Sequence, residues 1–207
     1  MKKILGFSLV LVVGVLICTY LLDKFHTSDI QKEIAGEIIR FHVRANSDSK
    51  EDQELKLKVK NEIVLHLESV LKNASSLDEA RNILYDDMGA ITEIALDVIH
   101  SEGYEYNVDV YFEEDYFPLK VYGDMTFPPG VYEAFRVDIG EACGKNWWCV
   151  LYPPLCFVDS TYSVVPQDTK DKFKDTLSED AYSAILSEDA SCTYEFKFKF
   201  LKFLNRE

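Results

Sequence analysis

The feature that most constrains the fold of this chain is a change in the spacing of its apolar residues near residue 104. Between residues 49 and 101, apolar side chains recur every three to four residues, which is typical of amphipathic helices with one buried face. From residue 104 to residue 152, apolar and polar residues largely alternate, which is typical of half-buried strands. The sequence therefore predicts an α+β fold, in which amphipathic helices pack on a mainly antiparallel sheet.

Two serines mark where the helices are expected to begin. Ser49 stands three residues before Asp52, and Ser76 stands three residues before Glu79. In this spacing the serine hydroxyl accepts a backbone N–H, and the acidic side chain reaches back to the backbone N–H of the serine. Gly89 falls inside the second helical pattern, where we expect it to kink or divide the helix.

An early strand is expected at 39–44, where apolar residues alternate with basic ones and predict a basic face that includes Arg40 and Arg44. A simpler interpretation is that these two arginines neutralise nearby carboxylates. Pro128-Pro129-Gly130 is expected to form a hairpin connection. The other expected elements are two short helices within 167–186 and strands at 104–112, 131–139, 147–152 and 194–200.

The amino terminus carries an export signal. Lys2 and Lys3 precede an uncharged run from Ile4 to Leu22, which is long enough to cross the roughly 30 Å hydrocarbon core of a bilayer. No small-residue cleavage site stands before Asp23, so a cleaved signal peptide and a retained anchor both stay open. We divide the chain into a signal peptide or membrane anchor at 1–22, a spacer at 23–36 and a single exported domain at 37–207.

The acidic composition excludes some classes of partner. The chain has a formal net charge of −14, and no acidic residue lies within its first 22 positions. The portion after the apolar run would therefore repel nucleic acid and anionic lipid surfaces. We expect no nucleic-acid partner, and membrane contact only through residues 4–22.

Four of the five cysteines follow the apolar run, and an even number in an exported protein favours disulfides. Four cysteines allow three connectivities. We favour pairing Cys149 with Cys156, which flank a proline bend, and Cys143 with Cys192; buried thiols are the alternative. The spacing contains no C-x-x-C pair, so a zinc site is not expected.

Residues 147–156 combine two tryptophans, two prolines and two cysteines. On a strand, Trp147 and Trp148 point to opposite faces, so one ring can enter the core while the other faces outward. Pro153-Pro154 ends strand pairing, because proline has no N–H. The segment suits packing or recognition better than proton transfer.

Four segments carry a resemblance to a known family. They are Ile39–Ser49, Phe117–Gly123, Pro129–Ala134 and Gly144–Phe157. Together they resemble the stage II sporulation protein R family of endospore-forming Firmicutes over about residues 37–157, with a weaker similarity at 196–201. Residues 159–190 are not covered by the resemblance.

The resemblance implies a signalling function. It implies that the chain is made in the forespore, exported into the space between forespore and mother cell, and able to activate a membrane-embedded aspartic protease of the mother cell. That protease would remove the pro-sequence of a sigma factor. The partner-binding residues that the resemblance implies are Arg40, Arg44, Asn46, Asp48, Tyr122, Trp147 and Trp148.

Catalytic motifs give little support for an enzyme. The acidic run Glu113-Glu114-Asp115 could hold a cation, but three successive carboxylates more often lie in solvent at the end of a strand. The histidines lack an H-E-x-x-H spacing, and cysteine thiolates are disfavoured in an exported protein. We expect no enzymatic activity, metal, cofactor or small-molecule substrate. The alternatives are an exported cell-wall hydrolase that uses residues 113–115 and a structural envelope protein.

Overall fold

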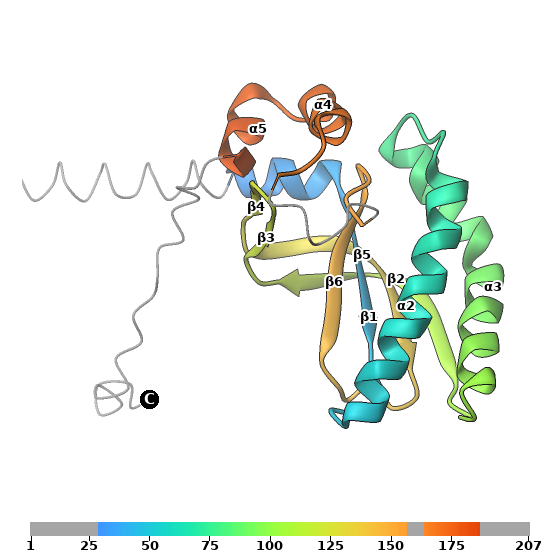
Figure 1. The fold of residues 1–207 in the computed structure, drawn as a ribbon. Helices are drawn as coiled ribbons and strands as arrows, with labels where there is room; N and C mark the ends of the chain where they lie inside the picture. The colour runs from blue at the N-terminus through green and yellow to red at the C-terminus, as the bar shows by residue number, and fades with distance from the viewer. Residues whose placement is uncertain (1–28, 157–163, 187–207) are drawn as a thin grey trace, which may run out of the picture.

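A four-stranded mixed sheet organises the computed structural model, which describes residues 29–156 and 164–186 (Figure 1). The α+β fold class is confirmed. Residues 29–37 are helical. The elements that follow are, in order, β1 (Ile39–Arg44), α2 (Lys50–Leu71), α3 (Leu77–Ser101), β2 (Val108–Phe117), β3 (Lys120–Tyr122), β4 (Met125–Phe127), β5 (Gly130–Ile139), β6 (Asn146–Tyr152), α4 (Gln167–Thr176) and α5 (Glu179–Leu186).

The strand order of the sheet is β2-β5-β1-β6, so β2 and β6 form its edges. β2 runs antiparallel to β5, and β6 runs antiparallel to β1. The central pair, β1 and β5, is parallel, with Phe41 opposite Phe135. A parallel pairing requires a long crossover connection, and the segment from α2 to β4 supplies it. The sheet is therefore mixed, and the expectation of a mainly antiparallel sheet holds for two of its three strand pairings but not for the central pair.

The larger core lies between the sheet and α2 and α3, which run side by side along one face (Figure 1). The apolar stripe of α2 is buried there, as its spacing predicts, and consists of Leu55, Val59, Ile63 and Leu67. α3 and the strands complete this core with Leu84, Ile91, Ala95, Ile99, Phe41, Val43, Phe135 and Val137.

The expected helix starts are confirmed, but the acidic side chains reach other partners. Ser49 Oγ accepts the N–H of Asp52 at 3.1 Å, and Ser76 Oγ accepts the N–H of Glu79 at 3.2 Å. The Asp52 carboxylate binds neighbouring side chains rather than the backbone of Ser49. The Glu79 carboxylate accepts the N–H and the hydroxyl of Ser75.

The second helix is not divided at Gly89, because α3 is continuous from Leu77 to Ser101. A glycine in a helix interior is less favourable than alanine by about 1 kcal/mol. That cost is small beside the burial of Leu84 on one side of the glycine and Ile91 on the other. The expected division is therefore wrong.

A second core covers the opposite face of the sheet, where it meets the β3–β4 hairpin, α4 and α5. Its largest apolar members are Phe117, Phe127, Tyr132 and Phe173. Arg40 and His42 of β1 lie on this side, and neither is exposed. The expected basic surface on β1 is therefore wrong, because this central strand is covered on both faces.

Part of the expected spacer belongs to the folded domain. Residues 29–37 form a helix, and Ile34 is fully buried in the second core beside Ile38. The expectation of a spacer is therefore wrong for residues 29–36. Residues 23–28 lie outside the described ranges.

The expected hairpin connection at residues 128–130 is replaced by a turn at Gly123. β3 pairs with β4 across this turn, and Gly123 has a positive φ of 56°, which glycine adopts readily. Pro128 and Pro129 join β4 to β5, which belong to different sheets. Strand pairing is interrupted at the two prolines, because proline lacks the N–H that pairing needs.

Several expectations concern residues outside the described ranges. They are the export segment 1–22, Cys192 and the closing strand 194–200. Within residues 29–156 and 164–186, no helix has both the length and the apolar character that a membrane crossing requires.

Candidate functional site

The edge strand β6 places its two tryptophans on opposite faces of the sheet, as strand geometry predicts. Trp147 lies on the α2 side, with its ring centroid 5.9 Å from that of Phe41 and 4.8 Å from Lys60 Nζ. Trp148 lies on the other side, with Lys120 Nζ 4.2 Å from its ring centroid. Both rings are half-buried, so the division into one inward and one outward ring is not observed.

Arg40 lies wholly buried in a box of aromatic rings. Its Cζ is between 4.6 and 5.8 Å from four ring centroids, which belong to Phe117, Tyr122, Phe127 and Tyr132. A desolvated cation–π contact contributes about 2 kcal/mol, which offsets part of the cost of burying the charge. Burial lowers the pKa of the guanidinium below its usual value. Within the described residues, Nε and Nη1 have no hydrogen-bond partner and no carboxylate lies at ion-pair distance.

Tyr122 connects Arg40 to Trp148. Its hydroxyl accepts a hydrogen bond from Arg40 Nη2 at 3.4 Å and donates one to the Trp148 carbonyl at 3.2 Å. Trp148 Nε1 is buried without a partner among the described residues, although buried indole N–H groups usually have one. Three of the seven predicted partner-binding residues therefore form one group, which we call the Arg40–Tyr122–Trp148 cluster.

Three other predicted residues bind the backbone of the loop that precedes β6. Arg44 Nε donates to a carbonyl of loop 140–145 at 3.4 Å. Asn46 Oδ1 accepts an N–H of the same loop at 2.9 Å, and Asp48 Oδ1 accepts another at 2.8 Å. Arg44 thus makes a backbone contact rather than the carboxylate contact that the sequence offered as an alternative. These three side chains hold loop 140–145, which precedes β6. We call the turn at the other end of β6, which contains Cys156, the cysteine turn.

The structure brings Cys149 and Cys156 to disulfide distance, with their Sγ atoms 2.36 Å apart and their Cα atoms 5.4 Å apart. This is the pair that the proline bend predicts. Among the described residues Cys143 is free and exposed. Its predicted partner Cys192 lies outside the described ranges, so that pairing stays a prediction.

The turn after β6 is closed by backbone hydrogen bonds. The Val150 carbonyl accepts the N–H groups of Leu155 and Cys156, each at 3.1 Å. The Tyr152–Pro153 peptide bond is cis, which is a conformation that proline tolerates within tight turns. β6 therefore ends at Tyr152, before the two prolines, and the turn that follows folds back against Val150 of the same strand.

A polar cluster on the second-core face joins residues that the sequence gave no reason to combine. His42 Nε2 lies 3.3 Å from Glu113 Oε1, and Arg136 Nη1 lies 2.5 Å from the same oxygen. Asp115 Oδ2 is 4.0 Å from His42 Nδ1, and Asp138 accepts from Arg136 Nε at 2.7 Å. Burial and then the charge of Arg136 lower the pKa of His42, so its ring is neutral near pH 7. Only the alternation of strand 39–44 signals that His42 shares a face with Arg40.

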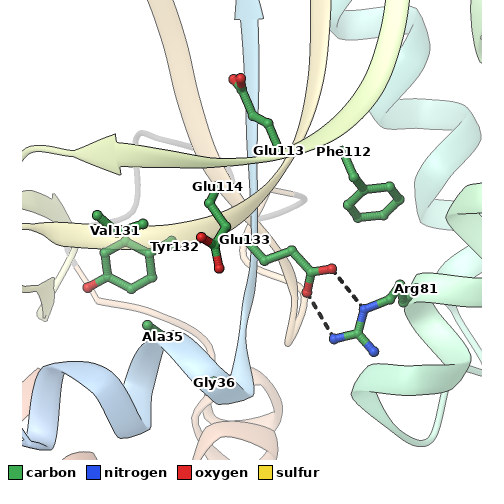
Figure 2. Close-up of a pocket in the computed structure, with 9 residues that line it drawn as sticks. All are labelled: Ala35, Gly36, Arg81, Phe112, Glu113, Glu114, Val131, Tyr132 and Glu133. Carbon is green, nitrogen blue, oxygen red and sulfur yellow. Dashed lines mark hydrogen bonds and ion pairs between the residues drawn. The ribbon is translucent and has the colours of Figure 1, made fainter.

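A cleft of about 520 Å³ lies beside this cluster, at the end of β5 that β1 does not cover. Figure 2 shows that Arg81 of α3 donates two hydrogen bonds, of 2.8 and 2.9 Å, to the carboxylate of Glu133 of β5. It also shows Glu113 and Glu114 pointing to opposite sides of β2. Both glutamates line the cleft, and Glu113 also belongs to the polar cluster.

Comparison with known proteins assigns the family. A family model described as stage II sporulation protein R (spore_II_R) matches residues 35–162, which is more than half of the chain. The chain belongs to the stage II sporulation protein R family. Stage II sporulation protein R of Bacillus subtilis (strain 168) is 37% identical over 139 residues, which cover 67% of this chain and 62% of that protein. The match thus spans less than two thirds of that relative. No solved structure matches the chain significantly.

The family match contains the sheet and the predicted partner-binding residues. Residues 35–162 span β1 to β6, whereas α4 and α5, which close the second core, follow the matched region. The family's description names a stage of sporulation and no enzymatic reaction. Membership of the stage II sporulation protein R family therefore supports a function in sporulation.

Proposed function

We propose that this protein is a sporulation signal that is exported from the forespore into the intermembrane space, where it activates a membrane-embedded aspartic protease of the mother cell. That protease then removes the pro-sequence of a sigma factor. The observation that carries the proposal is membership of the stage II sporulation protein R family. On this proposal the protein acts by binding and performs no catalysis itself.

Activation by binding has a definite energetic requirement. The protein must bind the active state of the protease more tightly than the inactive state. Shifting a two-state equilibrium from mostly inactive to mostly active takes about 5 kcal/mol of differential binding free energy. Aromatic residues near the centre of an interface supply free energies on that scale.

We place the contact at the Arg40–Tyr122–Trp148 cluster. Trp148 and Tyr122 are only partly buried, so part of each residue is accessible to a partner. Arg40 is fully buried and cannot touch a partner directly. Its guanidinium donates a hydrogen bond to the Tyr122 hydroxyl, which donates one to the β6 backbone at Trp148. Arg40 is therefore a positioning residue.

The chemistry of the exported portion agrees with this location. The pairing of Cys149 with Cys156 suits an oxidising compartment outside the cytoplasm, where disulfides persist. The net charge of −14 favours a basic or neutral partner surface. The apolar run at 4–22 would direct export and, if retained, would hold the domain at the membrane.

The alternative of a cell-wall hydrolase depended on the acidic run 113–115. The structure does not gather the three carboxylates in one place, because Glu113 pairs with Arg136 and Glu114 lies on the other side of β2 (Figure 2). No feature of the described residues favours a structural envelope protein over a signalling protein. We therefore favour signalling.

The test is sigma-factor processing in a non-sporulating host cell that makes the protease and the precursor sigma factor. Processing should occur only when this protein is also made and exported. Trp148→Phe should reduce processing at equal protein level. Leu65→Ala, which removes a 61% exposed side chain on α2, is the matched control and should leave processing unchanged. Unchanged processing with both Trp147→Phe and Trp148→Phe would remove the tryptophans from the contact surface.

A further inference from the structure

Three side chains with metal-binding chemistry meet on the second-core face of the sheet. His42 comes from β1, whereas Glu113 and Asp115 come from β2, and β5 runs between these strands. Ala134 of β5 stands directly opposite Glu113 in the strand register. Because Ala134 presents only a methyl group, the longer side chains from the two flanking strands approach one another over it.

The distances suit a shared ion. His42 Nε2 is 3.3 Å from Glu113 Oε1, and His42 Nδ1 is 4.0 Å from Asp115 Oδ2. One ligand atom from each of the three residues lies within 4.8 Å of the other two. Ligand atoms bound to one zinc ion at about 2.0 to 2.2 Å are up to roughly 4 Å apart. Small side-chain rotations would therefore complete the site.

His42 supplies a second and independent observation. Its side chain is 0% exposed, and neither ring nitrogen has a hydrogen-bond partner within the described residues. A neutral imidazole carries one N–H donor and one lone pair, and buried polar groups are nearly always paired. The nitrogen with the lone pair can therefore bind an ion that Glu113 and Asp115 also bind, while the other nitrogen keeps its proton.

The local charge favours a divalent cation. Glu113 and Asp138 pair with the guanidinium of Arg136, and Asp115 lies beside His42, so three carboxylates stand near one guanidinium. Asp138 gives Arg136 a carboxylate of its own, so Glu113 can share its charge with an ion. The side chains of Glu113 and Asp115 are 26% and 39% exposed, so an ion can enter from solvent while His42 forms the floor.

We propose that His42, Glu113 and Asp115 bind one divalent transition-metal ion. Imidazole nitrogen together with carboxylate oxygen suits zinc, whereas calcium and magnesium prefer ligand sets made only of oxygen. The ion would link His42 of β1 to Glu113 and Asp115 of β2, on either side of β5. It adds a function to a face of the domain for which the sequence predicted no metal.

Competition with a chromophoric zinc chelator tests the proposal on the full chain, purified in detergent without a histidine tag. We expect one zinc ion to bind per chain. Asp115→Asn and Glu113→Gln should each weaken zinc binding by about tenfold or more, since each removes a ligand. His66→Gln is the matched control, because His66 faces a single carboxylate, Asp87, at 2.6 Å.

Thermal unfolding gives an independent readout. Zinc should raise the Tm of the natural protein relative to protein treated with a chelator, because an ion that binds only the folded state stabilises it. Asp115→Asn, checked for folding by circular dichroism, should lose this increase, and His66→Gln should keep it. Equal zinc affinity of the natural protein and Asp115→Asn, or an equal loss in His66→Gln, would overturn the proposal.

Discussion

Asp52 holds together the turn that leads from β1 into α2. Its carboxylate accepts hydrogen bonds from the side chains of Ser47 at 2.5 Å, Asn46 at 2.9 Å and Tyr106 at 3.1 Å. Burial opposes the charge, but these bonds and that from Ser49 outweigh it and hold the pKa of Asp52 below its usual value. A single carboxylate thus joins the start of α2 to the segment before β2.

Asp52→Asn should lower the free energy of unfolding by about 2 kcal/mol at pH 7, because it removes charge-assisted hydrogen bonds. A carboxylate with a lowered pKa in the folded state stabilises fully above its unfolded pKa of about 4. That contribution is lost as pH falls through the lower folded pKa. Urea unfolding at pH 7, 5 and 3 should therefore show the difference from the natural protein shrinking only at pH 3.

Glu51→Gln is the control for this prediction, because Glu51 is the exposed neighbour of Asp52 in the same helical turn. It should leave the unfolding free energy nearly unchanged. A difference between Asp52→Asn and the natural protein that stayed constant down to pH 3 would contradict the account.

Arg40 tests whether shape or charge matters in the aromatic box. Arg40→Ala should lower the free energy of unfolding by about 3 kcal/mol, because it leaves a cavity among the rings. Arg40→Met should cost less than about 1.5 kcal/mol, since it fills the space and removes a buried charge that has no carboxylate partner among the described residues. Equal losses in urea unfolding would instead mean that the guanidinium itself stabilises the box.

Sequence reasoning reached some of these residues and missed others for a physical reason. The capping spacing identified Ser49 and Ser76, because the hydrogen bonds of a helix start are local in sequence. The environments of Arg40 and His42 depend on which strands lie beside β1. Alternation gives a strand two faces, but it does not say that both will be covered.

At the level of elements, α3 shows how tertiary packing overrides a local signal. An added Cβ at Gly89 meets no atom within 4 Å, and its φ is not positive. Gly89→Ala should therefore raise the free energy of unfolding by about 0.5–1 kcal/mol. Gly144→Ala is the contrasting variant, because its Cβ would lie 2.2 Å from the Ser47 carbonyl oxygen. Urea unfolding should show a gain for the first and a loss for the second.

The cysteine turn is predicted to stabilise the edge strand β6. Cys156→Ala should lower the free energy of unfolding by about 2 kcal/mol under oxidising conditions, because the crosslink restricts the unfolded chain. Cys143→Ala should have little effect if Cys143 is unpaired. Mass spectrometry of the unreduced protein should recover the peptides of Cys149 and Cys156 joined. A free Cys149 thiol in protein kept under oxidising conditions would contradict this pairing.

The elements themselves were largely predictable, whereas their arrangement was not. The spacing of apolar residues predicted α2 and β6, because periodicity reflects which side chains are buried. The parallel pairing of β1 with β5 joins segments about 90 residues apart, and nothing local encodes it. The short β3–β4 hairpin was missed because strands of three residues carry too little alternation to recognise.

Across the whole molecule, the central sheet separates two cores with different characters. The α2–α3 side is an apolar helix–sheet core, whereas the other side contains Arg40, His42 and the polar cluster. Trp147 belongs to the first side and Trp148 to the second. We therefore expect variants on the α2–α3 side to act mainly through stability, and conservative variants of the partly exposed Tyr122 and Trp148 to act mainly through signalling.

The most direct test of the signalling account is reconstitution of the protease in vesicles that carry the precursor sigma factor on the inside. The purified protein would be added to the outside, and precursor cleavage would be followed over time. The account predicts cleavage that depends on this protein and that weakens with Trp148→Phe while the protein stays folded. Cleavage at the same rate without the protein, or none with folded protein bound to the vesicles, would contradict it.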